Sequence, residues 1–448
     1  MERSAALLLV LALVNVSCCC LDPPAAYRFT GAVCRLTYPA AVVLNEKTTE
    51  VIQAAFQHAK YPSIEGQRSI GFGTVKYGFH NLEIHNLSIG KSEFELKENE
   101  GIGISISNVS AVFKGTINYG YGSWLLDLKQ SVDFEVESQI DLVINPKLYC
   151  GKGKVAICKE INNVSNILAD FIQEQAEQFL SDGDIGVDIS VTSSPIIKSD
   201  YIESYHKGLV IYNNTKSDLS TSVFNPSQLP ENRMLNFWIS DGLLDPLMSA
   251  AHHDGRLIRN ISGTELTDLF QTELSSARPE VLNKWLSSEG TMLKARSVSV
   301  PHLWTTTEGT SVRSVAGVEL LLDSQDMPAL YFETDVTVIV NASYAEKKLI
   351  LKATAERISI TKISTSEGPT ETEENLRSYL QEAVEKMGIP KVISYLEPEL
   401  TALMDEQGLN LFDLINPEVL PQDGYVIVQL DFGFPQHLLV EFLKRTLN

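Results

Sequence analysis

The first residues to test are those whose types and spacing could supply catalytic or metal chemistry. The chain has no G-x-S-x-G turn, so it offers no nucleophile of the α/β-hydrolase kind, and it has no H-E-x-x-H pair for zinc. DGDIGVD (182–188) looks like a calcium loop but lacks the later glycine and the distal glutamate. GFGTVKYG lacks the third glycine of a dinucleotide loop, and His252 and His253 are read as the polar end of a helix. We therefore predict a protein that is not an enzyme and that holds no metal and no cofactor.

Charge and composition exclude further classes of function. The 448 residues carry 57 acidic against 36 basic side chains, a formal net charge of -21. Nucleic acids and anionic membrane surfaces attract concentrated Lys and Arg, so neither is expected as the main partner. Hydrophobic content of 44% with 21% charged residues is enough for large cores and for two or three domains.

The amino terminus reads as an export signal. ALLLVLALV follows Arg3, is too short to span a bilayer, and is followed by small residues around Ser17. We place cleavage between Val16 and Cys20, and no later run of about 18 apolar residues occurs. The mature protein is therefore predicted to be soluble, secreted and extracellular.

Modification motifs agree with export. Of the 6 cysteines, three lie at the signal junction, and Cys150 and Cys158 are the natural disulfide pair in an oxidising compartment. Sequons of the N-x-S/T type predict glycosylation at Asn86, Asn108, Asn163, Asn213, Asn260 and Asn341.

Periodicity indicates helices packed on long antiparallel strands. A one-sided apolar stripe begins at Pro39 and ends near Tyr61, which predicts a helix. GIGISISNV (101–109) and SVDFEVESQIDLVIN (131–145) alternate apolar and polar side chains, which predicts strands with one apolar face. KGTINYGYGSW (114–124) between them reads as a hairpin connection.

The same order of elements occurs a second time. A helix is predicted from about 160 to 180, followed by strands in DIGVDISV and around YIESYHKGLVIY. FWISDGLLDPLMSAAHH (237–253) then reads as a helix, four strand patterns follow between 294 and 360, and a last long helix runs from Glu373 to Met387. We interpret this as an internal duplication joined near Phe224 to Arg233.

The chain ends on an amphipathic segment, FGFPQHLLVEFLKRTLN. Burying its apolar side chains is worth roughly 9 to 18 kcal/mol. Ordering its backbone costs roughly 13 to 26 kcal/mol, so two interpretations stay open: a permanently docked helix or a movable lid. Its apolar side consists of Leu438, Leu439, Val440, Phe442, Leu443 and Leu447.

Several segments carry a family resemblance. KYGFHNLEIHNLSI, NVSAVFKGTINYGY, ICKEINNVSNILADFI, LFDLINPE and DGYVIVQLDFGFPQHLLVEFL resemble the lipid-transfer and lipopolysaccharide-binding family that includes the bactericidal permeability-increasing protein. The resemblance covers nearly the whole mature chain. It implies an α+β fold in the shape of an elongated boomerang, with two barrels joined by a central sheet. Each barrel would be a highly curved antiparallel sheet wrapped around amphipathic helices, and a C-terminal amphipathic helix would follow.

The resemblance also implies the division of the chain. The expected parts are a signal peptide at 1–20, an N-terminal lipid-binding barrel at 21–215, a linker and central sheet at 216–235, a C-terminal lipid-binding barrel at 236–433, and an amphipathic lid helix at 434–448. An apolar tunnel would hold neutral lipid, with a phospholipid near each mouth and the lid over the opening of the N-terminal barrel.

The implied function is lipid transfer without bond breaking. The expected cargo is cholesteryl ester and triglyceride with phospholipid, and the expected partners are high-, low- and very-low-density lipoprotein particles, served by a monomer. The alternative within the family is immune recognition of lipopolysaccharide or phospholipid, which the acidic charge disfavours.

Family matching also names lipid-contact residues. The apolar side of the terminal segment would face lipid. Polar groups at the floor of the pocket match Gln173, Gln175, Ser204 and His206, although the family usually has an arginine where this chain has Gln175. His206 could equally be a hydrogen-bonded strand histidine.

One departure from the family is large. Relatives carry several dozen residues between the two cysteines, whereas only GKGKVAI separates Cys150 from Cys158 here. Half of a helix that covers the N-terminal barrel is therefore expected to be missing, which could open the tunnel or expose apolar sheet.

Overall fold

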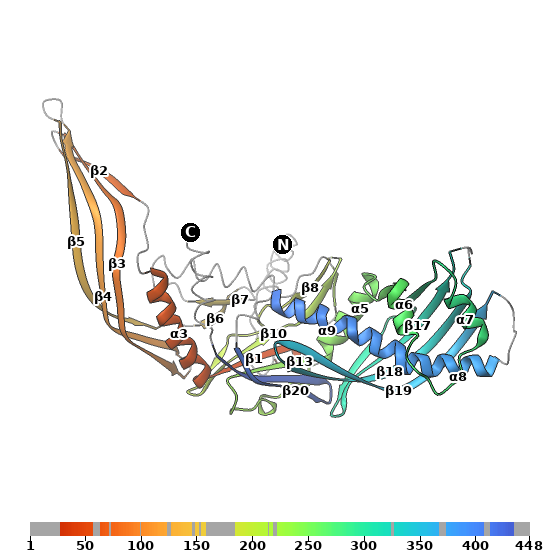
Figure 1. The fold of residues 1–448 in the computed structure, drawn as a ribbon. Coiled ribbons are helices and arrows are strands. Elements are labelled where there is room, and N and C mark those ends of the chain that lie inside the picture. Colours follow the sequence, from red (N-terminus) through yellow and green to blue (C-terminus); the bar gives the residue numbers. More distant parts are fainter. Residues whose placement is uncertain are drawn as a thin grey trace, which may run out of the picture.

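The computed structural model describes residues 27–56, 63–70, 73–98, 100–122, 127–145, 148–151, 154–157, 184–213, 215–217, 222–323, 327–366, 373–406 and 413–433. These residues form an elongated molecule with one sheet at each end and a third sheet between them (Figure 1). All strand pairs within the three sheets are antiparallel.

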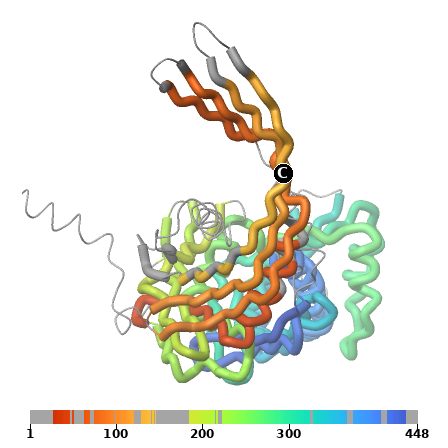
Figure 2. The backbone as a smooth tube through the Cα atoms, turned by 90° about the vertical axis from the view of Figure 1, so that its left-hand side faces the viewer, coloured from red at the N-terminus to blue at the C-terminus, as the bar shows by residue number. Residues whose placement is uncertain are grey.

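The N-terminal sheet has the strand order β2-β3-β4-β5. Its long strands rise from the body of the molecule to a distant tip (Figure 2). Helix α3 (Tyr38–Phe56) packs against β3, where Asn45 exchanges hydrogen bonds with Ser92, and the side chain of Gln53 accepts from the backbone of Ile89. The strands are β2 (Ile64–Ile70), β3 (Gly73–Lys97), β4 (Gly101–Gly122) and β5 (Asp127–Ile144).

The predicted connection at 114–124 is wrong, because residues 114–122 belong to β4. Its glycines mimic a turn, but Gly115 is needed inside the strand: a Cβ there would lie 3.0 Å from the Phe134 ring, which leans over it from β5. Register shifts in β3 and β4 instead accommodate left-handed residues, Asn81 with φ 51° and Asn108 with φ 56°.

The central sheet joins segments that lie far apart in the sequence, in the order β20-β21-β13-β1-β10-β9. Strand β1 pairs with β10 on one side and with β13 on the other, so the start of the chain lies beside its middle. The strands are β1 (Ala32–Thr37), β9 (Ile196–Ile197), β10 (Tyr201–His206), β13 (Leu235–Ser240), β20 (Asp413–Gln422) and β21 (Tyr425–Gly433).

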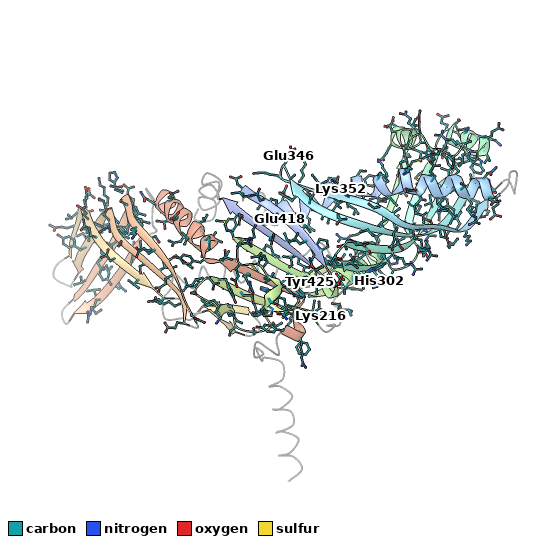
Figure 3. The ribbon with its side chains drawn as sticks, turned by 90° about the horizontal axis from the view of Figure 1, so that it is seen from below. Lys216, His302, Glu346, Lys352, Glu418 and Tyr425 are labelled. Atoms are coloured by element: carbon teal, nitrogen blue, oxygen red, sulfur yellow. The ribbon has the colours of Figure 1, made fainter. Side chains whose placement is uncertain are left out.

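The C-terminal sheet has the order β14-β15-β17-β18-β19, with β16 paired to β17. The turn between β18 and β19 reaches back to the central sheet, where Lys347 lies 3.5 Å from Asp413. Figure 3 shows Glu346 at this turn. The strands are β14 (Ile258–Ser262), β15 (Met292–Ser297), β16 (His302–Thr306), β17 (Gly309–Leu321), β18 (Leu330–Ala345) and β19 (Lys348–Thr365).

Five helices accompany the C-terminal sheet among the described residues. The predicted helix at 237–253 begins only at Asp241, because FWIS belongs to β13; the predicted last helix continues past Met387 through a π-helical turn (Val384–Gly388) to Glu406. The core under the sheet combines Trp285, Phe332, Ile360 and Leu380 with neighbouring apolar residues. The helices are α5 (Asp241–His253), α6 (Gly263–Leu269), α7 (Glu280–Leu286), α8 (Glu373–Ala383) and α9 (Ile389–Glu406).

Small strands complete the described chain: β6 (Leu148–Gly151), β7 (Lys154–Ile157), β8 (Ile185–Asp188), β11 (Leu209–Tyr212) and β12 (Thr215–Lys216). The predicted mixed α+β class with antiparallel sheets is confirmed. Within the described residues each sheet is open, so closed barrels remain a prediction.

Candidate functional site

The central sheet has one buried face and one half-exposed face, because its strands alternate side chains between the two. On the buried face Val33 pairs with Tyr205 and with Trp238, which are all nearly inaccessible to solvent. We call the other side the half-exposed face. It consists of Ala32, Cys34, Leu36, Ile202, Ser204, His206, Leu235, Phe237 and Ile239.

The polar atoms of this face form one chain of hydrogen bonds. Ser204 Oγ lies 2.9 Å from Nε2 of His206, and Nδ1 of the same ring lies 2.7 Å from the carbonyl oxygen of Ile189. The three groups come from β10 and from the segment after β8. The predicted pocket residues Ser204 and His206 are thus brought together, as a bonded pair.

Burial keeps the ionisable groups of this face neutral. It lowers the pKa of His206, an effect that the hydrogen bond to Ile189 partly opposes. Burial first, and the negative charge of Glu203 second, raise the pKa of the Cys34 thiol to about 12. A neutral imidazole and a protonated thiol suit an apolar ligand better than charged groups would.

A tight turn holds the Ile189 carbonyl in place. Oδ1 of Asp188 accepts from both N–H and Oγ–H of Ser190, and Lys216 lies 2.6 Å from Oδ2. Burial alone would raise the pKa of Asp188, but the bonds from Lys216 and Ser190 outweigh it and lower the pKa to about 2. Figure 3 labels Lys216 in the middle part of the molecule.

The buried face carries an ion pair that fixes the sheet to the linker. Nε of Arg35 lies 2.6 Å from the carboxylate of Glu203, and the guanidinium also donates to the carbonyls of Leu229 and Pro226. Tyr205 donates to the same carboxylate. Because the charges are paired and hydrogen-bonded, the sheet that carries the half-exposed face is held rigidly.

A serine bonded to an oriented histidine could in principle be a nucleophile and base. Ser204 lies within a strand, however, and the chain lacks the turn that exposes a hydrolase serine.

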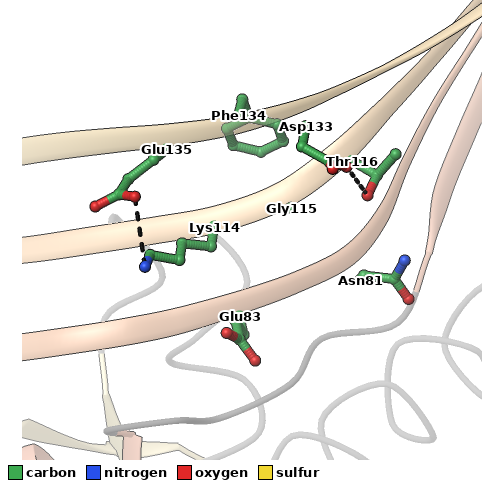
Figure 4. A pocket seen from close by; sticks show the side chains of 8 residues that line it. All are labelled: Asn81, Glu83, Lys114, Gly115, Thr116, Asp133, Phe134 and Glu135. Carbon is green, nitrogen blue, oxygen red and sulfur yellow. Dashed lines mark hydrogen bonds and ion pairs between the residues drawn. The ribbon is translucent and has the colours of Figure 1, made fainter.

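A separate hollow of about 620 Å³ lies on the N-terminal sheet where β3 bulges (Figure 4). Its side chains are mainly polar and pair with one another: Lys114 lies 3.4 Å from Glu135, and Thr116 donates to Asp133 at 2.8 Å. This hollow therefore does not suit an apolar ligand.

The remaining predicted site residues fall into two groups. Outside the described residues lie Gln173, Gln175, Cys158, Asn163 and residues 434–448, which carry the apolar side of the terminal segment; the side chain of Cys150 also lies outside them. The other predicted glycosylation sites are all exposed: Asn86, Asn108, Asn213, Asn260 and Asn341.

Sequence reasoning missed Cys34, which lies directly opposite Ser204, and Leu36 and Phe237, which share the half-exposed face with the pair. The available signal was the alternation in AVCRLT and LNFWIS, which predicts one buried and one less buried row in each strand. Among the described residues no group of His, Cys, Asp and Glu side chains is arranged to hold a metal ion. None of the described helices has the length and apolarity needed to cross a bilayer.

Comparison with known proteins places the chain among relatives. Residues 43–181 match the model of the LBP / BPI / CETP family, N-terminal domain, and residues 180–414 match that of the C-terminal domain. The cholesteryl ester transfer protein of Gallus gallus is 41% identical, covering 98% of this chain and 97% of that protein. The Homo sapiens protein of the same name is 40% identical, covering 92% and 94%. The crystal structure of a lipopolysaccharide binding protein aligns over 90% of this chain and 99% of that one at 17% identity, with a TM-score of 0.38.

The alignment with the chicken protein also shows a difference in length. It runs over 492 positions, more than the 448 residues of this chain, so that relative has residues without a counterpart here. The alignment length does not place these residues within the chain, so the loss between the two cysteines stays a prediction.

Proposed function

The chain belongs to the LBP / BPI / CETP family, and from this premise we propose that it is a secreted carrier of cholesteryl esters and triglycerides between lipoprotein particles. The observation that carries the proposal is the 41% identity to a cholesteryl ester transfer protein over 98% of the chain. The half-exposed apolar face of the central sheet supports it, because a carrier needs apolar surface that its own side chains do not fill.

The physical reason for such a carrier is the insolubility of its cargo. Moving an acyl chain of about sixteen methylenes into water costs on the order of 13 kcal/mol at ~0.8 kcal/mol per methylene. Free desorption from a lipoprotein surface is therefore very slow. A protein with an internal apolar path would remove the aqueous step without breaking any bond.

We propose that residues 434–448 of the terminal segment form a lid over the opening of this apolar path. It follows directly on β21, an inner strand of the central sheet, whose last residue Gly433 pairs with Asp413 of the edge strand β20. Its apolar side would cover lipid, while Glu441, Lys444 and Arg445 would remain in water.

The test of cargo is transfer of labelled lipid. Cholesteryl ester and triglyceride, each labelled in one lipoprotein class, are incubated with the protein and an acceptor class, which is then separated and counted. Labelled ester in the acceptor supports the proposal. Binding of lipopolysaccharide without ester transfer would instead support the immune function, and release of free cholesterol would show hydrolysis.

The lid is tested by variants on its two sides. Deleting Gln436 to Asn448, or replacing Phe442 by Glu, should abolish neutral-lipid transfer while the circular dichroism spectrum is preserved. Glu441→Gln, on the polar side of the same segment, is the matched control and should transfer normally. Full activity of the deletion variant would refute the lid.

Export and processing form a separate part of the proposal. We expect cleavage of residues 1–20, a Cys150–Cys158 disulfide and glycans on exposed sequons, all of which mass spectrometry of protein from the culture medium would detect. A variant that restores a relative's longer segment between the two cysteines serves as the comparison. If only that variant reaches the medium, the short form is not a secreted carrier.

A further inference from the structure

The hydrogen-bond chain on the half-exposed face has a direction. A backbone carbonyl can only accept, so Nδ1 of His206 must carry the proton that it donates to Ile189 at 2.7 Å. In the neutral ring Nε2 then has no proton and must accept. The single hydroxyl hydrogen of Ser204 is therefore donated to Nε2 at 2.9 Å.

The direction of these hydrogen bonds decides which hydrogen-bonding groups of Ser204 remain available to a ligand. Its hydrogen is engaged by His206, and only the lone pairs of Oγ remain. Both residues are partly accessible, and they share the face with the apolar residues Leu36 and Phe237. Toward a ligand, Ser204 Oγ thus accepts hydrogen bonds and does not donate them.

We propose that this pair selects a hydroxyl-bearing neutral lipid, such as an unesterified sterol or a diacylglycerol, over a fully esterified one. The inference rests on the proposed function, in that the half-exposed face must contact lipid. Cholesteryl esters and triglycerides have ester oxygens that accept and no donor, so they find no partner at Ser204. A lipid hydroxyl donates to Ser204 and leaves the bonds from Ser204 to His206 and from His206 to Ile189 intact.

An ester carbonyl could bind Ser204 only by taking its hydrogen. Nε2 of His206 would then be left without a donor in a largely buried position, which is unfavourable. Cys34, whose strand position is directly opposite Ser204, does not replace the lost donor well, because a thiol donates weakly. The expected preference is about tenfold, equivalent to about 1.4 kcal/mol.

The test compares two ligands of nearly the same shape. Radiolabelled cholesterol and radiolabelled cholesterol 3-O-methyl ether are presented to the full-length protein from phosphatidylcholine vesicles, and bound ligand is measured after gel filtration. The ether keeps the oxygen but has no donor hydrogen. We expect the wild-type protein to bind cholesterol about tenfold more tightly than the ether.

Variants locate the effect at Ser204. Ser204→Ala should bind both ligands equally, whereas Ser204→Thr, which keeps the hydroxyl, should retain the preference. Equal binding of cholesterol and ether by the wild-type protein would overturn the inference while leaving the proposed ester carrier intact. Binding of neither sterol, and no transfer of ester, would refute both. The wild-type ligand comparison decides the matter even if Ser204→Ala fails to fold.

Discussion

The two end sheets of the molecule differ in how completely their apolar side chains are buried. In the C-terminal half, Trp285 and Tyr379 are almost completely buried in a cluster that also includes Phe332 and Leu380. Among the described residues of the N-terminal sheet, the buried cluster consists of Ile84, Leu87 and Ala111 with partly buried neighbours. Along β5, Val132 and Val136 are each 50% exposed and Val143 is 67% exposed.

The edges of the sheets show the same contrast. Helix α9 borders the edge strand β19, where Glu397 accepts from the backbone of Leu351 at 2.7 Å and Thr401 accepts from Leu349 at 3.1 Å. Strand β5, 18 residues long, is an edge of the N-terminal sheet and is lined by exposed side chains. The C-terminal sheet is thus covered by its own helices, and we infer that the N-terminal sheet depends on a further cover, either lipid or the rest of the chain.

The largest expected difference between the two halves is the stability lost when a core leucine is truncated to alanine. Leu330→Ala removes a side chain from the ten-residue C-terminal cluster and should destabilise that half by about 4 kcal/mol, while Leu87→Ala in the small N-terminal cluster should cost about 2 kcal/mol. Urea unfolding followed by circular dichroism measures both. Equal losses would show that the two cores are equally well packed and would end the comparison.

The same valine-to-threonine substitution in each end sheet should give a smaller difference in stability between them. Val136→Thr, on the exposed face of β5, should change stability by less than about 0.5 kcal/mol in lipid-free protein. The same change at Val318, which packs against the C-terminal cluster, should cost about 1 to 2 kcal/mol. Thermal unfolding of the lipid-free variants compares them. A large loss at Val136 would mean that protein already covers this face.

Much of the fold could be predicted from the sequence because it follows from local alternation. The strands at 101–109 and 131–145 were predicted by period-two patterns; the first lies within β4, and the second lies in β5 except for its last residue. The error at 114–122 has a tertiary cause, since Gly115 is required by a ring on the neighbouring strand and not by a turn. Helix α9 was missed because Pro390 and Pro398 look like stop signals, yet Pro390 lies in its first turn.

The site was less accessible to sequence reasoning. Ser204 and His206 were named from family resemblance, and no pattern near them indicates that they bond to each other. Their arrangement depends on Ile189, which the turn around Asp188 and Ser190 brings to the ring. Such a contact between non-adjacent segments is set by the tertiary fold, which alternation along one strand does not encode.

The contact between α9 and the edge strand β19 gives a prediction with a smaller and more local effect. Glu397→Ala removes the acceptor for the Leu351 N–H, so this amide should exchange with solvent about fivefold faster, corresponding to about 1 kcal/mol. Glu397→Gln keeps a side-chain carbonyl and is the matched control. Hydrogen exchange with mass spectrometry of β19 peptides reports the change. Unchanged exchange in Glu397→Ala would show that α9 does not protect this edge.

The smallest expected effect is a pH dependence confined to the C-terminal half. The hydroxyl of Ser276 and the backbone N–H groups of Ser275 and Ser276 lower the pKa of Glu382 from 4.5 to about 2. A carboxylate with a lowered folded-state pKa stabilises the fold fully above the unfolded value. Its contribution is then lost as the pH falls from about 4.5 to about 2.

This predicts that the loop containing Ser275 and Ser276 opens in that pH window before the rest of the half unfolds. Hydrogen exchange of the loop, corrected for the intrinsic pH dependence and compared with peptides from β5, measures the opening. Glu382→Gln should open the loop already at neutral pH and should remove most of the pH dependence, because the amide cannot ionise. Glu385→Gln, an exposed carboxylate in the next turn, is the control. A loop that opens in acid equally in Glu382→Gln would place the titrating group elsewhere, and the contrast between the two sheets would then rest on apolar packing alone.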